Sequence, residues 1–534
     1  MIPVGRLPPG DQWDCHILDL LFANRLYPTG LEFGRHEGYP DADGTILIVP
    51  GRYWAGREAE ISDAVARYDW LLLIVTSDEE STFDATRIRH PRMRCWIQTP
   101  RVDRDYGDAR LIPLGFPPHF DDLPAPDGRP TEVFLAAQNT HTRRVEAFAA
   151  LARDTHIQRV HGSAGFTLGL SPQEYVRQMC RARVAPAPSG AFSPDTFRLW
   201  EALEAHTIPI ADDRSPVYDS RGYWQRTAPG TPFPVLADYA DLPGYIGDVL
   251  ADYPRRANRA TAWWMARKRQ MAQWVGDDLT ALGARLSYTD RLPITVMVST
   301  SPIPSHPDTA IIDETIASVR AQLPDSEIVL MHDGVRPDQQ HRRADYETYI
   351  QRVLWSADHQ WRNVLPLIFD DHLHQAGCTI RALEHVRTPL LLFIEGDTPL
   401  TGEIPWAAIS DTIVHGDANV VRFSHEAHIL DVHRYLTLDA DPQTVRGVPM
   451  TRTIQWSQRP HLASVAWYRN TLDRHFRTGT TDFIEEVFHG RLIEAHRRDG
   501  DMGWLTWRTW LYTPPGDIKR SYHLDGRNHG RTRE

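Results

Sequence analysis

Two acidic residues, Glu395 and Asp397, end the apolar string PLLLFIEGD. Side chains two residues apart on an extended chain point the same way, so both carboxylates are expected on one side of a strand end. Such a pair suits a hard divalent cation that keeps other coordination positions for diphosphate oxygens. The motif therefore indicates a site for a divalent cation that also binds diphosphate oxygens, although a solvated turn produces the same string.

The segments before this motif alternate between strand and helix patterns. Residues 294–299 and 327–332 are strand candidates, helices are predicted over 310–322 and 377–386, and the strand 389–394 leads into the acids. This alternation predicts parallel α/β layers, in which the ends of the strands meet at one edge of a sheet. The pattern is less regular after residue 404.

This order resembles the nucleotide-binding half of GT-A glycosyltransferases, above all the large inverting, family-2-like group. The resemblance implies that Thr300 and Asp333 hold the nucleoside and that Arg381 belongs to the donor site. It also implies that Glu395 and Asp397 bind the metal, Mn²⁺ or Mg²⁺, with Glu395 standing where the family usually has Asp.

Two later segments extend the resemblance. TTDFIEEVFHGRL is similar to the family's acceptor-side segment and places Glu485 and Glu486 at its acidic pair. Glu486 takes the position of the base that removes the acceptor proton. In the tail, the resemblance gives His523 the role of a third metal ligand, and Arg527 could clamp the diphosphate.

A different signal lies in FSPDTFRLWEALEAHTIPIADD, where a loop enters a helix and presents free N–H groups that suit a diphosphate. The segment resembles the donor site of GT-B transferases, most closely the exostosin-like ones. That resemblance implies a second, metal-independent donor site. Its residues are Ser193, Thr196, Arg198 and Glu201. The acids at 78–80 are candidates in the preceding unit.

The chain has 534 residues, 41% of them hydrophobic, which predicts several globular domains. We expect an α/β protein of three Rossmann-like units: 1–125, the acceptor side of a GT-B module; 126–288, its donor side; and 289–534, a GT-A domain. The four cysteines lie too far apart to indicate a zinc site or a disulfide framework. The absence of a signal-peptide pattern and of any membrane-length apolar run predicts a cytoplasmic protein.

The sequence therefore predicts a bifunctional glycosyltransferase that uses nucleotide-sugars and a glycan hydroxyl acceptor. One alternative is a phage-type enzyme that glycosylates hydroxylated bases in DNA, because residues 252–269 and the C-terminal tail are rich in arginine. The net charge of −12 and the lack of a DNA-binding motif count against it. Another alternative is a non-catalytic carbohydrate-binding scaffold. A nucleotidyltransferase is disfavoured because STSPIPSHPD is not a Gly-rich basic loop.

Overall fold

The computed structural model describes residues 1–9, 12–126, 128–165, 168–289, 292–477, 479–516 and 518–524. It is an α/β protein that divides into two compact units, Met1–Thr289 and Asp290–Glu534. No helix among the described residues is long and apolar enough to cross a membrane.

The first sheet of unit 1 is wholly parallel, with the strand order β2-β1-β3-β4-β5-β6. Its central strands are buried along their whole length, as expected when helices cover both faces of a parallel sheet. The elements are β1 (Ile2–Arg6), α1 (Gln12–Phe22), β2 (Phe33–Glu37), β3 (Gly44–Pro50), α2 (Gly51–Trp54), α3 (Glu58–Val65), β4 (Trp70–Thr76), β5 (Met93–Gln98) and β6 (Arg110–Ile112).

The second sheet of unit 1 is also parallel, with the order β11-β10-β9-β7-β8. Its elements are β7 (Thr131–Gln138), α4 (Thr142–Leu151), β8 (Gln158–Ser163), α5 (Pro172–Cys180), β9 (Ala182–Ala187), α6 (Phe197–Glu204), β10 (Ile208–Asp212), α7 (Tyr223–Thr227), β11 (Val235–Leu236) and α8 (Leu242–Ala251).

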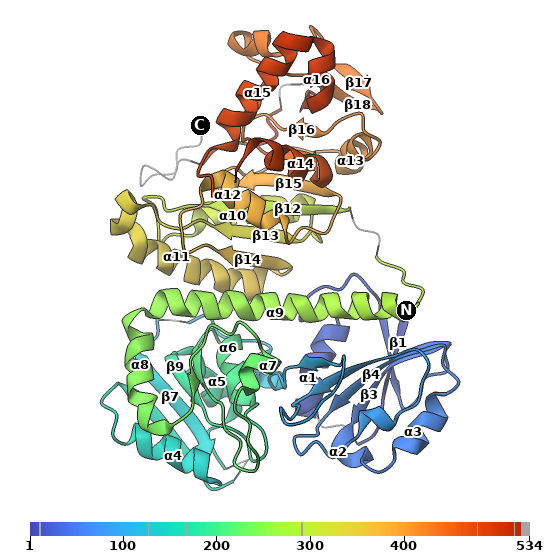
Figure 1. Ribbon diagram of the computed structural model, residues 1–534. Helices are drawn as coiled ribbons and strands as arrows, with labels where there is room; N and C mark the ends of the chain where they lie inside the picture. Colours follow the sequence, from blue (N-terminus) through green and yellow to red (C-terminus); the bar gives the residue numbers. More distant parts are fainter. Residues whose placement is uncertain are drawn as a thin grey trace. The chain divides into compact units, whose positions relative to one another are not determined.

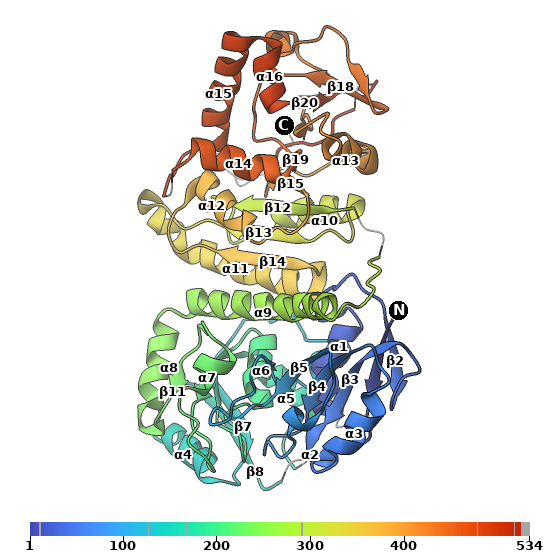
Figure 2. The same ribbon diagram turned by 45° about the vertical axis from the view of Figure 1, so that its right-hand side comes forward.

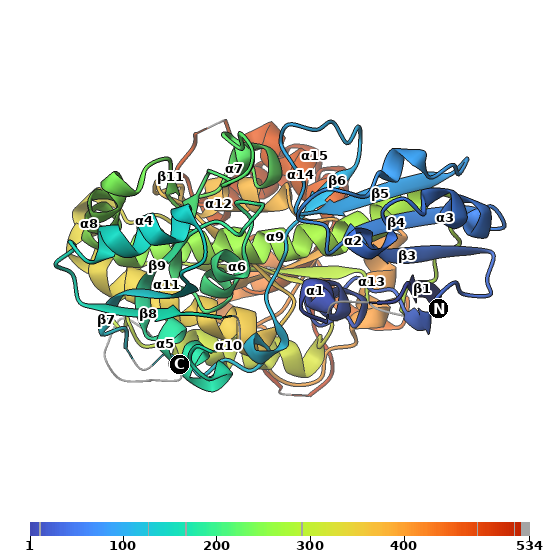
Figure 3. The same cartoon turned by 90° about the horizontal axis from the view of Figure 1, so that it is seen from below.

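One long helix, α9 (Tyr253–Ala281), runs along both sheets of unit 1 (Figures 1 and 3). Near its end, Asp278 accepts hydrogen bonds from Trp96 Nε1 and Arg110 Nε of the first sheet, both at 2.7 Å. Further back, Trp264 Nε1 and Lys268 Nζ donate to Glu204 at the end of α6, which packs on the second sheet, at 2.6 and 3.1 Å. The two sheets share one apolar cluster beneath this helix, so they form a single unit.

Unit 2 contains a mixed sheet with the order β14-β13-β12-β15-β19-β16-β20-β18-β17. The first four strands are parallel, and β19 runs antiparallel to β15. The strands are β12 (Ile294–Thr300), β13 (Ile328–His332), β14 (Val364–Ile368), β15 (Leu390–Glu395), β16 (Val420–Arg422), β17 (Gln443–Val445), β18 (Val448–Arg452), β19 (His461–Ser464) and β20 (Thr509–Tyr512).

The helices of unit 2 are α10 (Ala310–Gln322), α11 (Arg343–Ser356), α12 (His374–Leu383), α13 (Trp406–Val414), α14 (Val465–His475), α15 (Ile484–Asp499) and α16 (Asp501–Trp507). Helices α15 and α16 lie with the strands β18 and β20 (Figure 2). The region after residue 404, which looked irregular in the sequence, therefore supplies the second half of the sheet. Its strands are short and none carries a long apolar run, which explains why the pattern was hard to read.

Candidate active site

The strand order of unit 2 locates a crevice. The chain builds β12, β13 and β14 outward in one direction and then places β15 on the other side of β12. Open α/β sheets bind ligands at the carboxyl ends of the strands, where the order reverses in this way. A cavity of about 320 Å³ lies at that point. Five of the residues predicted from the sequence line it: Thr300, Asp333, Glu395, Asp397 and His523.

A tight turn after β15 fixes the acidic pair. Thr398 N donates to the Glu395 carbonyl at 3.0 Å, and Glu395 N donates to Thr398 Oγ1 at 3.1 Å. Thr315 Oγ1 holds the Gly396 carbonyl at 2.9 Å. A β-carbon at Gly396 would lie 3.0 Å from Thr300 Cγ2, so the ends of β12 and β15 are closely packed. The turn therefore places both carboxylates at the cavity.

His523 returns from the C-terminal segment to this turn. Its Nε2 lies 3.2 Å from Asp397 Oδ2, and Leu524 N donates to the Asp397 carbonyl at 2.8 Å. Among the described residues, the side chains of Glu395, Asp397 and His523 are not all within 4.8 Å of one another. Asp397 and His523 are thus the pair placed to share one cation, and Glu395 stands further back.

The electrostatics of Glu395 show a concentration of negative charge. Burial, followed by the charges of Asp397 and Glu485, raises the pKa of Glu395 to about 8, against the opposing effects of His523 and Gln375. Gln375 Nε2 donates to Glu395 Oε1 at 3.1 Å. A cation among these carboxylates would relieve their mutual repulsion, so the donor set of carboxylates and imidazole fits a divalent metal.

Asp333 has a different surrounding from the one predicted. Its Oδ1 accepts hydrogen bonds from Gly334 N and Leu373 N, both at 2.8 Å. Its Oδ2 accepts from His374 N at 3.1 Å and lies 2.7 Å from His372 Nδ1. The backbone N–H groups of Gly334, Leu373 and His374 thus engage both carboxylate oxygens. Asp333 therefore holds the loop before α12 in place.

Thr300 is also turned inward. Its Oγ1 lies 2.8 Å from His332 Nδ1 and donates to the Met331 carbonyl at 3.1 Å. The loop after β12 is held by His306, whose ring stacks on Tyr349 with the centroids 3.8 Å apart. Thr300 thus shapes the cavity wall while its hydroxyl is engaged within the protein.

The two glutamates at the start of α15 face different surroundings. Glu485 Oε2 accepts a hydrogen bond from Gln458 N at 2.8 Å, and its charge acts on Glu395. Both glutamates are exposed. Successive residues on a helix point about 100° apart, so the two carboxylates differ in direction. Glu485 is the one whose charge acts on Glu395, and no such effect is described for Glu486, the predicted base.

Of the two predicted arginines, one lies away from the cavity and the other is outside the described residues. Arg381 is exposed on α12, where its closest acidic neighbour is Glu384 at 3.8 Å. It lies seven residues beyond His374, about 10 Å along the helix from the cavity end. Arg527 lies outside the described residues.

The cavity also has walls that sequence analysis did not identify. His372, His374 and Gln375 line it from the start of α12, together with Arg336 and Phe483. The ring of His374 meets that of Phe483 edge-on, with the centroids 4.0 Å apart. The string DDHLHQ, with two histidines before a helix, was the available signal.

In unit 1 the four predicted donor-binding residues are largely internal. Ser193 is 1% exposed and its Oγ accepts a hydrogen bond from Asp195 N at 3.1 Å. Glu201 accepts the Tyr175 hydroxyl at 2.5 Å, and burial raises its pKa to about 7. Ser193 and Glu201 therefore support the fold. Thr196 and Arg198 stand at the start of α6, where the carboxyl ends of the strands meet.

The comparisons with known proteins do not assign the chain to a family. No protein-family model matches the chain, and no curated protein matches it. Among solved structures, the chain is similar to S. aureus TarS residues 1–349, with a TM-score of 0.29 and 14% identity over 43% of this chain and 60% of that one. It is also similar to the mannosyltransferase PcManGT from Pyrobaculum calidifontis, in complex with GDP-Man and Mn²⁺, with a TM-score of 0.27 and 15% identity over 42% and 58%.

The chain therefore spans less than two thirds of the length of these structures. Likenesses at such TM-scores carry no argument about function.

Proposed function

We propose that the chain is a glycosyltransferase whose unit 2 moves a sugar from a nucleotide-sugar donor to a hydroxyl group of a glycan acceptor. The observation that carries this proposal is the placement of Asp397 and His523, with Glu395 behind them, at a cavity over the switch point of the sheet. Its volume of about 320 Å³ is in the range of small-molecule sites.

On the donor side, Asp397 and His523 would hold Mn²⁺ or Mg²⁺, and the imidazole favours Mn²⁺ because Mg²⁺ prefers oxygen ligands. Such a cation supplies positive charge against the diphosphate leaving group. Asp333 acts as a positioning residue, because it fixes the loop that carries His372 and His374. Those two rings and Phe483 form the wall against which the nucleobase lies.

On the acceptor side, Glu485 replaces Glu486 as the base. It takes the proton of the acceptor hydroxyl while the oxygen bonds to the anomeric carbon and the bond from that carbon to the diphosphate breaks. The hydrogen bond from Gln458 N to Oε2 orients the carboxylate and leaves Oε1 for the acceptor.

We further propose that unit 1 is a second, metal-independent donor-binding module, which makes the chain bifunctional. The support is the parallel order of its two sheets and the pair of arginines at the start of α4 and α6, discussed below.

A DNA acceptor is less well supported. In the basic segment of α9, Arg267 Nη2 donates to the carbonyls of Leu111 and Thr227 at 2.9 and 3.2 Å. Lys268 is buried against Glu204. These cations stabilise unit 1 and are not available for phosphates of a duplex. The basic end of the tail lies outside the described residues.

The test is a panel of UDP-, GDP- and dTDP-sugars, assayed by thermal unfolding and by release of nucleoside diphosphate, with Mn²⁺ or with EDTA. At least one donor should stabilise the chain and turn over only with Mn²⁺. Asp397→Asn should lower that turnover at least a hundredfold, whereas the exposed Asp473→Asn should not change it. Unchanged metal-dependent turnover in Asp397→Asn would sink the proposal. Stabilisation by a donor without any turnover would favour the non-catalytic scaffold.

A further inference from the structure

The second sheet of unit 1 has a switch point of its own. The chain passes from β7 to β8 on one side and then to β9 on the other side of β7. A crevice for ligands is therefore expected at the carboxyl ends of β7 and β9. Two helices begin at that edge: α4 directly after His141, and α6 directly after Thr196.

Both helices begin without a side-chain cap. Threonine at this position normally accepts a hydrogen bond from the first turn, yet Thr196 makes no such bond. Its Oγ1 has no hydrogen-bond partner, although the residue is only 5% exposed. Both ring nitrogens of His141 are likewise buried without a well-formed hydrogen bond, and the Ser189 backbone lies nearby. Buried polar atoms are nearly always hydrogen-bonded, so unpartnered ones gathered at one edge indicate groups that serve a ligand.

Two arginines stand beside these groups. Arg198 Nε donates to the Ala136 carbonyl at 2.7 Å, which fixes the plane of its guanidinium. Arg144, in the first turn of α4, has an Nε without a partner. Burial and the charge of Arg198 lower the pKa of Arg144 to about 10. Two guanidinium groups at two helix N-termini create a positive potential that favours an anion.

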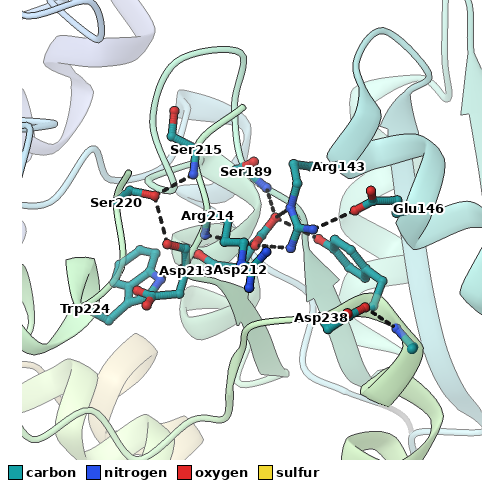
Figure 4. A network of polar contacts seen from close by, with 12 residues as sticks. Arg143, Glu146, Ser189, Asp212, Asp213, Arg214, Ser215, Ser220, Trp224 and Asp238 are labelled. Atoms are coloured by element: carbon teal, nitrogen blue, oxygen red, sulfur yellow. Dashed lines mark hydrogen bonds and ion pairs between the residues drawn. The ribbon is translucent and has the colours of Figure 1, made fainter. Parts of the chain in front are cut away.

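A buried network keeps this edge rigid (Figure 4). Arg143 binds Asp212 through two hydrogen bonds, Nη2 to Oδ1 at 2.7 Å and Nε to Oδ2 at 3.0 Å. Ser189 N and the Tyr239 hydroxyl donate to Asp212 Oδ2 at 3.4 and 3.1 Å. The network joins α4 to the ends of β9 and β10, so the positions of His141 and Arg144 are set in advance.

The first sheet contributes one residue near this edge. Glu79 follows β4, and its Oε2 lies 3.6 Å from the place of a β-carbon at Gly190. The carboxylate makes no hydrogen bond to the described residues, and its charge acts on Arg144. The acid after β4 therefore faces the positive edge of the second sheet.

We propose that unit 1 binds a ligand bearing a phosphate or diphosphate group in this crevice. Arg144 and Arg198 pair with the anion, Thr196 and His141 donate hydrogen bonds to it, and Glu79 accepts a hydrogen bond from a ligand hydroxyl. The inference depends on the proposal that unit 1 is a donor-binding module and is independent of sugar transfer by unit 2. In this proposal Arg144, His141 and Glu79 take the place of Ser193 and Glu201 as ligand-binding residues, because the structure places Ser193 and Glu201 inside the fold.

The experiment uses the full chain carrying Asp397→Asn, so that the cation site of unit 2 does not contribute. Pyrophosphate, UDP and GDP are titrated calorimetrically in EDTA. We expect one pyrophosphate per chain. Arg144→Gln should weaken its binding about tenfold or more, because a charge-assisted contact is lost. Thr196→Val should weaken it several-fold. Tighter binding of UDP or GDP than of pyrophosphate would identify a nucleotide, and equal binding would identify another phosphorylated compound.

Thr196→Val tests whether weaker binding comes from misfolding, because the Thr196 hydroxyl has no hydrogen-bond partner in the protein and its removal should not disturb the fold. The melting temperature without ligand should stay equal or rise, while the shift caused by pyrophosphate shrinks. The matched control for Arg144 is Arg153→Gln, an exposed arginine just beyond α4. Absence of pyrophosphate binding, or equal binding by Arg144→Gln and the control, would overturn this inference. Loss of sugar transfer by unit 2 would not contradict the inference about unit 1.

Discussion

Replacement of Glu485 by glutamine should remove most sugar transfer at unit 2, whereas Glu486→Gln should have little effect. The two residues are adjacent on α15, but Glu485 accepts the Gln458 amide at 2.8 Å and its charge acts on Glu395. Both side chains are exposed, but only Glu485 has these two contacts among the described residues. We therefore expect the Glu485 carboxylate to act on a hydroxyl at the acidic turn.

The size of the effect follows from the role of a base. Proton removal by a positioned carboxylate contributes about 10²–10⁴-fold to a rate, or about 3–5 kcal/mol of transition-state stabilisation. Glu485→Gln keeps an amide oxygen for the Gln458 N–H, so the loop and the fold should persist. We expect Glu486→Gln to stay within about twofold of the native kcat, as for a surface change.

The assay measures initial rates of nucleoside diphosphate release with Mn²⁺, and separates kcat from the KM of the donor. Glu485→Gln should lower kcat with little change in the donor KM. If Glu485→Gln retains more than half of the native kcat, it is not the base. If Glu486→Gln instead shows the loss, α15 is turned relative to the arrangement described above.

Three further changes test the packing and the charges. Gly334→Ala should destabilise the chain by about 2 kcal/mol or more, because its β-carbon would lie 2.3 Å from the Asp371 carbonyl carbon, and should weaken donor binding. In the Glu201→Gln variant, the amide oxygen should still accept the hydrogen bond from the Tyr175 hydroxyl. Since the unfolded Glu201 ionises near its ordinary pKa of 4.5 and the folded one near 7, the native chain loses stability as pH rises between these values. The variant should gain at most about 3 kcal/mol at pH 8 and nothing at pH 4, by chemical denaturation. Glu79, whose pKa burial raises to about 7, should weaken pyrophosphate binding as pH rises through that value, beyond the change due to the ionisation of pyrophosphate itself, and Glu79→Gln should abolish this additional dependence in calorimetry.

Each of these changes has a matched comparison. Gly490→Ala, on α15 with nothing within 4 Å, should stabilise by up to about 1 kcal/mol. An equal effect of both glycine changes would contradict the steric argument. The charged groups that face Glu79 come from several elements: Asp14, Arg52, Glu80, Arg144 and Asp195. A pH dependence that persists in Glu79→Gln would assign it to one of these groups.

The sequence was sufficient to predict the strands that end at the cavity. The strands β12, β13 and β15 are unbroken apolar runs followed at once by polar residues, so their ends were readable. Because parallel strands share an edge, Thr300, Glu395 and Asp397 could be placed together without knowing the register. His523 joins them through a hydrogen bond from Leu524 N, a long-range contact for which the resemblance was the only guide.

The sequence could not predict which way a side chain points or which groups of the protein already bond to it. Nothing in the pair Glu485–Glu486 says which side of α15 faces the sheet. Nothing in the string HDGV shows that the backbone N–H groups of Gly334, Leu373 and His374 engage the Asp333 carboxylate. Glu201 of unit 1 is a similar case. It fits a donor motif in the sequence, but its side chain is only 5% exposed and accepts a hydrogen bond from the Tyr175 hydroxyl. A motif fixes residue types at a spacing, and tertiary packing decides which of them face the ligand.

The two units meet the same electrostatic problem in opposite ways. Both place a crevice at a switch point, where helix N-termini and strand ends converge. In unit 2 the strand ends carry carboxylates, which repel a diphosphate unless a cation lies between them, so binding there should fail in EDTA. In unit 1 the helices α4 and α6 carry Arg144 and Arg198, which attract the anion directly, so binding there should survive EDTA and weaken with salt. A single titration of pyrophosphate with and without Mn²⁺ therefore separates the two sites by their chemistry.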